Sequence, residues 1–197
     1  MVTTVLLVGL LAIAAVTDFR RHKIYNWTTY SGILLAWAWN GIGEIVAKRS
    51  PAWPPGLTRR LLVERLGWIG LEQSLYGFLL CGVVLLICYV IFGGQISGGD
   101  VKLIAMMGAL MGPQRGIEAM LWTFVLGFCI AISILVWRVG PLRLVALSLR
   151  RLAGLLRLSA RPLQPEEQAL LKLPLSLAPG ALAAAVIVQF ALVGPVA

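Results

Sequence analysis

The chain of 197 residues is too apolar to fold as a soluble globular protein. Hydrophobic residues make up 59% of it and charged residues only 13%, against a usual charged share of about 25%. So few polar residues cannot cover a core in water, and so apolar a chain is not intrinsically disordered. The composition therefore indicates an all-α, polytopic membrane protein.

The net charge of +9 suits a membrane protein whose basic loops stay on the cytoplasmic side and attract anionic lipid. No soluble segment combines a basic patch with interleaved aromatic residues, so nucleic acid is not expected as a partner. The three cysteines form no CxxC pair, which argues against a disulfide framework and a zinc site. They are Cys81, Cys88 and Cys129.

Charge-free stretches predict about six transmembrane helices in one domain, 1–197, because a crossing helix needs about 20 apolar residues. In chain order the stretches are 1–17, 24–43, 73–99, 103–114, 119–137 and 173–197. The pair Gly93-Gly94 is expected to end the third helix early. The fourth helix would reach only about 18 Å, and whether it crosses the bilayer or dips into it stays open.

The first apolar run is followed, not preceded, by basic residues, namely Arg20, Arg21 and Lys23. That order argues against a signal peptide. It predicts that the N-terminus lies outside and that the first loop is cytoplasmic.

A second basic pattern, in 141–163, predicts an amphipathic helix on the inner leaflet. Arg143, Arg150 and Arg157 recur every seven residues among leucines, which places them on one helix face. A lipid-surface anchor and a partner-docking role are both compatible with this pattern.

Asp18 and Asp100 are the only two aspartates in the chain, and each lies at the end of an apolar run on the predicted cytoplasmic side. An ionisable group there costs several kcal/mol unless it is paired or hydrated, so both are functional candidates. Either could instead be a helix cap or mark a helix end. If the two carboxyls meet, their repulsion leaves one protonated, which is the state that an aspartyl protease needs to activate water.

The neighbours of the aspartates add candidates. Gly98 and Gly99 have no Cβ and would let backbone and substrate approach Asp100 closely. Lys102 either offsets the local negative charge or extends to the interface, and Asn26 either caps the second helix or bonds in the site. His22 is the only histidine, so no metal site is expected.

Three segments resemble the type IV prepilin peptidases, a GxGD family of membrane aspartyl proteases. Residues 97–103 resemble the GxGD-x-K-L signature, residues 17–26 resemble the first catalytic segment, and residues 173–181 resemble the proline-rich entry to the last helix. The three segments occur in the order expected for the family, so the resemblance covers about residues 1–194.

Two residues depart from the family pattern. Ser97 stands at the position of the first glycine of GxGD, and a positive φ there would disfavour serine. Tyr25 stands at a position where proline is common.

The resemblance implies a multi-pass aspartyl endopeptidase of the bacterial inner membrane with no cofactor. It would remove short basic leaders from prepilins or pseudopilins at the cytoplasmic face, after a glycine, for type IV pilus assembly or protein secretion. Asp18 and Asp100 would be catalytic, and Gly98, Gly99, Lys102 and Asn26 would shape the loop and contact substrate. Membrane lipid is the other expected partner, and the oligomeric state is not indicated.

Larger members of that family carry an N-terminal cytoplasmic domain with paired CxxC motifs and methylate the processed pilin. This chain has no CxxC and no room for such a domain, so it resembles the short, peptidase-only form of tight-adherence pilus systems. Two other hypotheses are compatible with the sequence: an ion- or proton-coupled transporter that uses the same two aspartates, and a non-catalytic subunit of a membrane assembly. Acids at helix ends favour proteolysis over transport.

Overall fold

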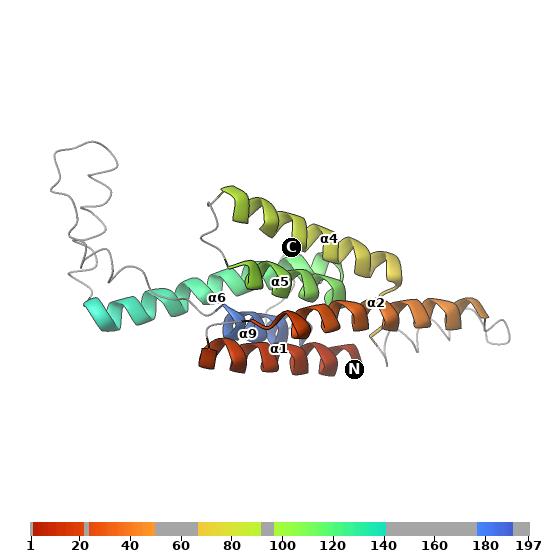
Figure 1. Cartoon of the computed structure of the whole chain (residues 1–197), viewed down its shortest axis with the longest axis horizontal. Coiled ribbons are helices and arrows are strands. Elements are labelled where there is room, and N and C mark those ends of the chain that lie inside the picture. The colour runs from red at the N-terminus through yellow and green to blue at the C-terminus, as the bar shows by residue number, and fades with distance from the viewer. Residues whose placement is uncertain (1, 22–23, 50–66, 92–96, 141–176, 191–197) are drawn as a thin grey trace. The chain divides into compact units, whose positions relative to one another are not determined.

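The computed structural model describes residues 2–21, 24–49, 67–91, 97–140 and 177–190, which form six helices and no strand (Figure 1). The helices are α1 (Val2–Arg21), α2 (Asn26–Arg49), α4 (Leu71–Ile91), α5 (Gly98–Met111), α6 (Pro113–Val139) and α9 (Ala178–Gln189). This confirms the all-α prediction. The amphipathic helix predicted at 141–163, His22 and the Gly93-Gly94 pair lie outside the described residues.

The chain divides into two units, one of residues 1–124 with 176–197 and one of residues 125–175. The first unit contains α1, α2, α4, α5, α9 and the first half of α6, and it is called the bundle below. Asp18, Asp100 and the residues around them all belong to the bundle.

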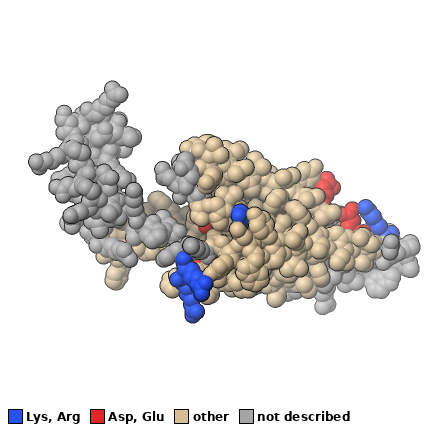
Figure 2. Space-filling model, viewed as in Figure 1, with Lys and Arg blue, Asp and Glu red and all other residues tan. Residues whose placement is uncertain are grey.

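Among the described helices, α1, α4 and residues 113–137 of α6 are long and apolar enough to cross a membrane. The helix α2 has the length, but Asn26, Asn40 and Glu44 make it more polar. Most of the bundle surface in Figure 2 carries no charged side chain, as expected for a surface in lipid.

In α1, buried side chains recur every three or four residues and so form one stripe along the helix. They are Thr3, Leu7, Leu11, Ala14, Ala15 and Asp18. The opposite face exposes large apolar side chains such as Val5, Val16 and Phe19. Because water is absent from the bilayer core, that exposed face suits lipid, while the buried stripe faces the other helices.

The centre of the bundle is α5, in which every residue from Leu103 to Met111 is buried. It packs against α4 most extensively and also contacts α2, α9 and α1. A helix that is apolar all round belongs inside a bundle. At 14 residues it is about 21 Å long, and its neighbours rather than lipid surround it.

The boundaries of α5 and α6 differ from the prediction. The helix α5 begins at Gly98, five residues before the predicted start, because the polar first turn is capped by Ser97. It ends at Met111 and is capped by Gly112, whose φ of 81° suits glycine. Then α6 begins at once with Pro113 and includes Arg115 and Glu118, since charged side chains are tolerated at an exposed helix end.

Hydrogen bonds fix the direction of α9 against α1. The Ala178 backbone N–H donates to Asp18 Oδ2 at 3.3 Å, and Gln189 Nε2 donates to Thr4 Oγ1 at 2.7 Å. The two helices therefore run antiparallel and lie side by side (Figure 1).

These contacts define two ends of the bundle. The aspartate end contains Asp18, Asn26, Asp100 and Ala178. The far end contains Thr3, whose hydroxyl donates to the Gly67 carbonyl at 3.1 Å, and Trp68, whose indole N–H donates to the Asn40 carbonyl at 3.0 Å.

Candidate active site

Asp18 lies in the last turn of α1, at the end of the buried stripe, and is only 7% exposed. Its position follows from the helical repeat that also buries Ala14 and Ala15. Its Oδ2 accepts a hydrogen bond from the backbone N–H of Ala178, the first residue of α9. Because the first N–H groups of a helix have no partner within the helix, they bind a carboxylate well.

Asp100 lies in the first turn of α5 and is also 7% exposed. It lies outside the three helices that can cross a membrane. Burial, followed by the negative charge of Asp18, raises the pKa of Asp100 to about 6, against an opposing hydrogen bond with the Ser97 backbone. Leu177 lines a small cavity beside Asp100, and the next residue, Ala178, donates to Asp18, so the fold brings the two aspartates, distant in sequence, to the same end of the bundle.

Apolar side chains cover one side of Asp100. A cavity of about 10 Å³ adjoins it, which is no more than the space of about one water molecule. Because its walls are largely hydrocarbon, they withhold hydration from the carboxyl, which is the main cause of the raised pKa. The cavity walls include Leu85, Leu103, Ile104, Phe124 and Leu177.

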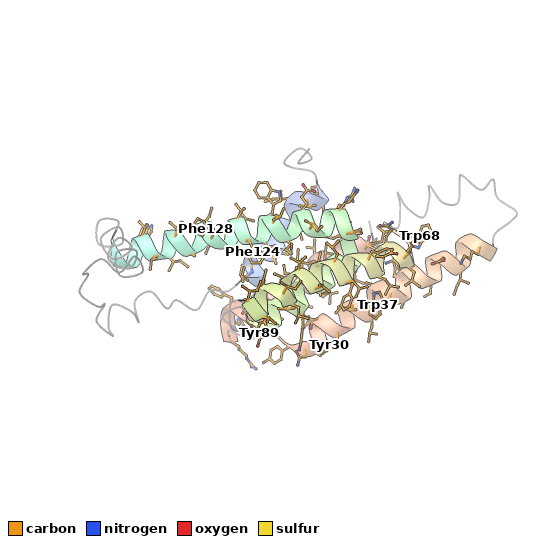
Figure 3. All side chains as sticks on the ribbon, turned by 90° about the horizontal axis from the view of Figure 1, so that it is seen from above. Tyr30, Trp37, Trp68, Tyr89, Phe124 and Phe128 are labelled. Carbon is orange, nitrogen blue, oxygen red and sulfur yellow. The ribbon has the colours of Figure 1, made fainter. Side chains whose placement is uncertain are left out.

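Lys102 connects α5 with α2 beside the aspartates. Its Nζ donates to Asn26 Oδ1 at 2.9 Å and lies 5.1 Å from the centre of the Tyr30 ring, labelled in Figure 3. The sequence leaves open whether Asn26 caps α2 or bonds in the site; in the structure its side-chain oxygen accepts a hydrogen bond from Lys102. Sequence reasoning missed Tyr30, although an aromatic residue four positions after Asn26 shares its helix face.

Gly98 and Gly99 form the first turn of α5 rather than a loop. An added Cβ at Gly99 would come within 3.1 Å of Ile24 Cβ, whereas one at Gly98 would meet nothing within 4 Å. Space is therefore tight at Gly99, and a larger residue there would have to displace Ile24 by a few tenths of an ångström. At Gly98 the absence of a side chain leaves the backbone beside Asp100 accessible.

Ser97 fits its position as the N-cap of α5. Its φ is −68° and its hydroxyl oxygen accepts from the Gly99 N–H at 3.2 Å. The position does not require a positive φ, so serine at the first place of the signature is compatible with this backbone. Serine is among the best N-cap residues.

Replacing Ser97 by alanine is expected to lower the free energy of unfolding by about 1 kcal/mol, because the Gly99 N–H loses its acceptor. Ser97→Gly should cost only a few tenths of a kcal/mol. Denaturant unfolding of the purified protein in detergent measures both. Equal stability of Ser97→Ala and the unsubstituted protein would show that the cap contributes nothing.

Tyr25, the second departure, contacts the preceding helix. Its hydroxyl accepts from Arg21 Nη1 at 2.6 Å. The contact joins the end of α1 to the start of α2 without proline. Across the described ranges, no three His, Cys, Asp or Glu side chains come together in a way that could hold a metal ion.

The family model of the type IV leader peptidases matches residues 5–132, about two thirds of the chain. The matched residues include Asp18, Asn26, Asp100 and Lys102. Neither a curated protein nor a solved structure matches the chain. Together with its apolar helices, the match establishes that this membrane protein belongs to the type IV leader peptidase family.

Proposed function

We propose that this peptidase is an aspartyl endopeptidase that uses Asp18 and Asp100 as its catalytic pair. The observation that carries the proposal is that two buried aspartates, from the end of α1 and the start of α5, lie at the same end of the bundle, where Leu177 lines the cavity beside Asp100 and Ala178 donates to Asp18. The negative charge of Asp18 also raises the pKa of Asp100. Such a pair holds one proton between two acids, as water activation requires.

The environments of the two carboxyls suggest their roles. Asp100 holds the proton, because apolar walls disfavour its charge. Water activation is assigned to Asp18, because its Oδ2 accepts from the Ala178 N–H at the start of α9, a contact that favours a carboxylate.

In the proposed reaction, Asp18 takes a proton from water while the water oxygen attacks the peptide carbonyl carbon. Asp100 donates its proton to the carbonyl oxygen, which gives a neutral tetrahedral diol. The diol then collapses: the proton held by Asp18 passes to the leaving nitrogen, and a diol hydroxyl returns a proton to Asp100. Both carboxyls regain their starting states, and no covalent intermediate forms.

The substrate proposed is the N-terminal leader segment of a prepilin or pseudopilin, cut at the cytoplasmic face of the bacterial inner membrane. The exposed Gly98 backbone beside Asp100 supports approach by an extended peptide. The bond between Lys102 and Asn26 ties the first turns of α5 and α2 together, which positions Asp100. Family membership favours this function over the transporter and the assembly subunit.

Leader cleavage is expected to slow as pH rises through about 6. Asp100 is protonated below its pKa of about 6 and ionised above it, and only the protonated form can donate to the carbonyl oxygen. Above pH 6, kcat/KM should therefore fall toward a loss of about tenfold per pH unit. The pH dependence is measured from initial rates of prepilin cleavage in detergent. The range from about pH 5.5 to about 8.5 brackets the pKa of Asp100 and extends well above it.

The matched control is Glu72→Gln, because Glu72 is an exposed acid at the far end, in the first turn of α4. This variant should show the unsubstituted profile. A rate that is constant or rises across the same pH range would contradict the proton-donating role of Asp100.

A further inference from the structure

A second, larger cavity lies at the far end of the bundle, away from the aspartates. Its volume is about 510 Å³, within the range of small-molecule sites. The starts of α1, α4 and α6 and the end of α9 meet there. Its walls include Thr3, Trp68, Gln73, Met111, Arg115 and Gln189.

The polar part of this far-end cavity is suited to an anion. Arg115 supplies a guanidinium, and Gln73 and Gln114 supply side-chain amides. None of the described residues that line it is acidic. Since arginine binds phosphate with two parallel N–H bonds, a phosphate ester is the best-matched anion.

The remaining wall is apolar. Ile69, Leu110 and Met111 line it together with Trp68, which is labelled in Figure 3. The Trp68 indole N–H donates to the Asn40 carbonyl. Tryptophan is typical of the membrane–water interface. The helices that are long and apolar enough to cross a membrane also begin at this end, which in a bilayer would place the cavity near the lipid headgroups.

We propose that the far-end cavity binds the phosphate headgroup of an anionic phospholipid. Arg115 and the glutamine amides hold the phosphate, while Trp68 and its apolar neighbours contact the glycerol and the first methylenes of the chains. This site is separate from Asp18 and Asp100 and does not depend on the proposed peptidase mechanism.

Native mass spectrometry of the purified full-length protein, delipidated and then titrated with phosphatidylglycerol, measures the binding. The unsubstituted protein should retain the lipid, and Arg115→Gln should bind it about tenfold more weakly, because a charge-assisted contact is lost. Arg115 is exposed, so its replacement should not affect folding; the elution profile checks this. The control Lys48→Gln removes an exposed cation of the same end, paired with Glu44 outside the cavity, and should bind like the unsubstituted protein.

Two further ligands distinguish the contribution of the phosphate from that of the apolar part of the lipid. Diacylglycerol, which lacks the phosphate, should bind weakly to all variants, and inorganic phosphate should displace little phosphatidylglycerol, because it lacks the apolar part. Equal retention by Arg115→Gln, equal loss in Lys48→Gln, equal binding of diacylglycerol, or full displacement by inorganic phosphate would each overturn the proposed lipid site.

Discussion

Replacing Asp18 or Asp100 by asparagine is expected to abolish leader cleavage, with a loss of at least about 10³-fold in kcat, because each proposed step needs a carboxyl that exchanges a proton. Asparagine keeps the shape of aspartate, and its side-chain oxygen can still accept from the Ala178 N–H that now binds Asp18. Both variants should therefore insert and fold. The measurement is the gel shift of a prepilin co-expressed with each variant.

Glu72→Gln controls for the loss of an acid as such, and it should process the prepilin at the unsubstituted rate. Membrane level and detergent elution profile establish that the aspartate variants are folded. Normal processing by a folded Asp18→Asn or Asp100→Asn variant would remove the catalytic pair from the mechanism, although the family membership would stand.

Replacing Gly77 by alanine is expected to cause a large loss of stability in the helix bundle. A Cβ at Gly77 would collide with the Gly108 carbonyl and lie 2.7 Å from the Gly112 carbonyl carbon. Because these are backbone atoms, no change of rotamer can relieve the contact, and α4 and α5 must separate. We expect a cost of about 3 kcal/mol, at the upper end for overpacking.

The separation should also reduce catalysis, since α5 carries Asp100. A displacement of about 1 Å at a reacting group can cost about 10²-fold in rate. Thermal unfolding in detergent and the cleavage rate of the same preparation measure the two effects together.

The matched control for Gly77→Ala is Gly9→Ala, another glycine inside a helix. An added Cβ at Gly9 meets nothing within 4 Å, so alanine should raise stability by about 0.5–1 kcal/mol through its better helix propensity. If Gly77→Ala and Gly9→Ala unfold at the same temperature, the close packing of α4 on α5 is not a major source of stability.

Composition and local pattern were enough for the class of protein and for most helices. The charge-free runs predicted α1, α2, α4, α6 and α9, because apolar length is a local property that lipid selects directly. The helical repeat that ends at Asp18 is also readable in the sequence. The start of α5 was missed by five residues because its first turn is polar, and a cap such as Ser97 is defined by backbone geometry rather than by hydropathy.

The amino-acid sequence alone was thus enough to predict the membrane class, the helical elements and the two aspartates as candidate site residues. Each of these depends on residues that are close in sequence. The fold, by contrast, determines that Asp18 and Asp100 lie at the same end of the bundle, that the Ala178 N–H joins α9 to α1, and that Lys102 bonds to Asn26. Their partners lie far apart in sequence, and no local preference specifies them. Only the packing of α5 among its neighbours, made close by Gly77 and Gly108, brings these groups to the same end of the bundle.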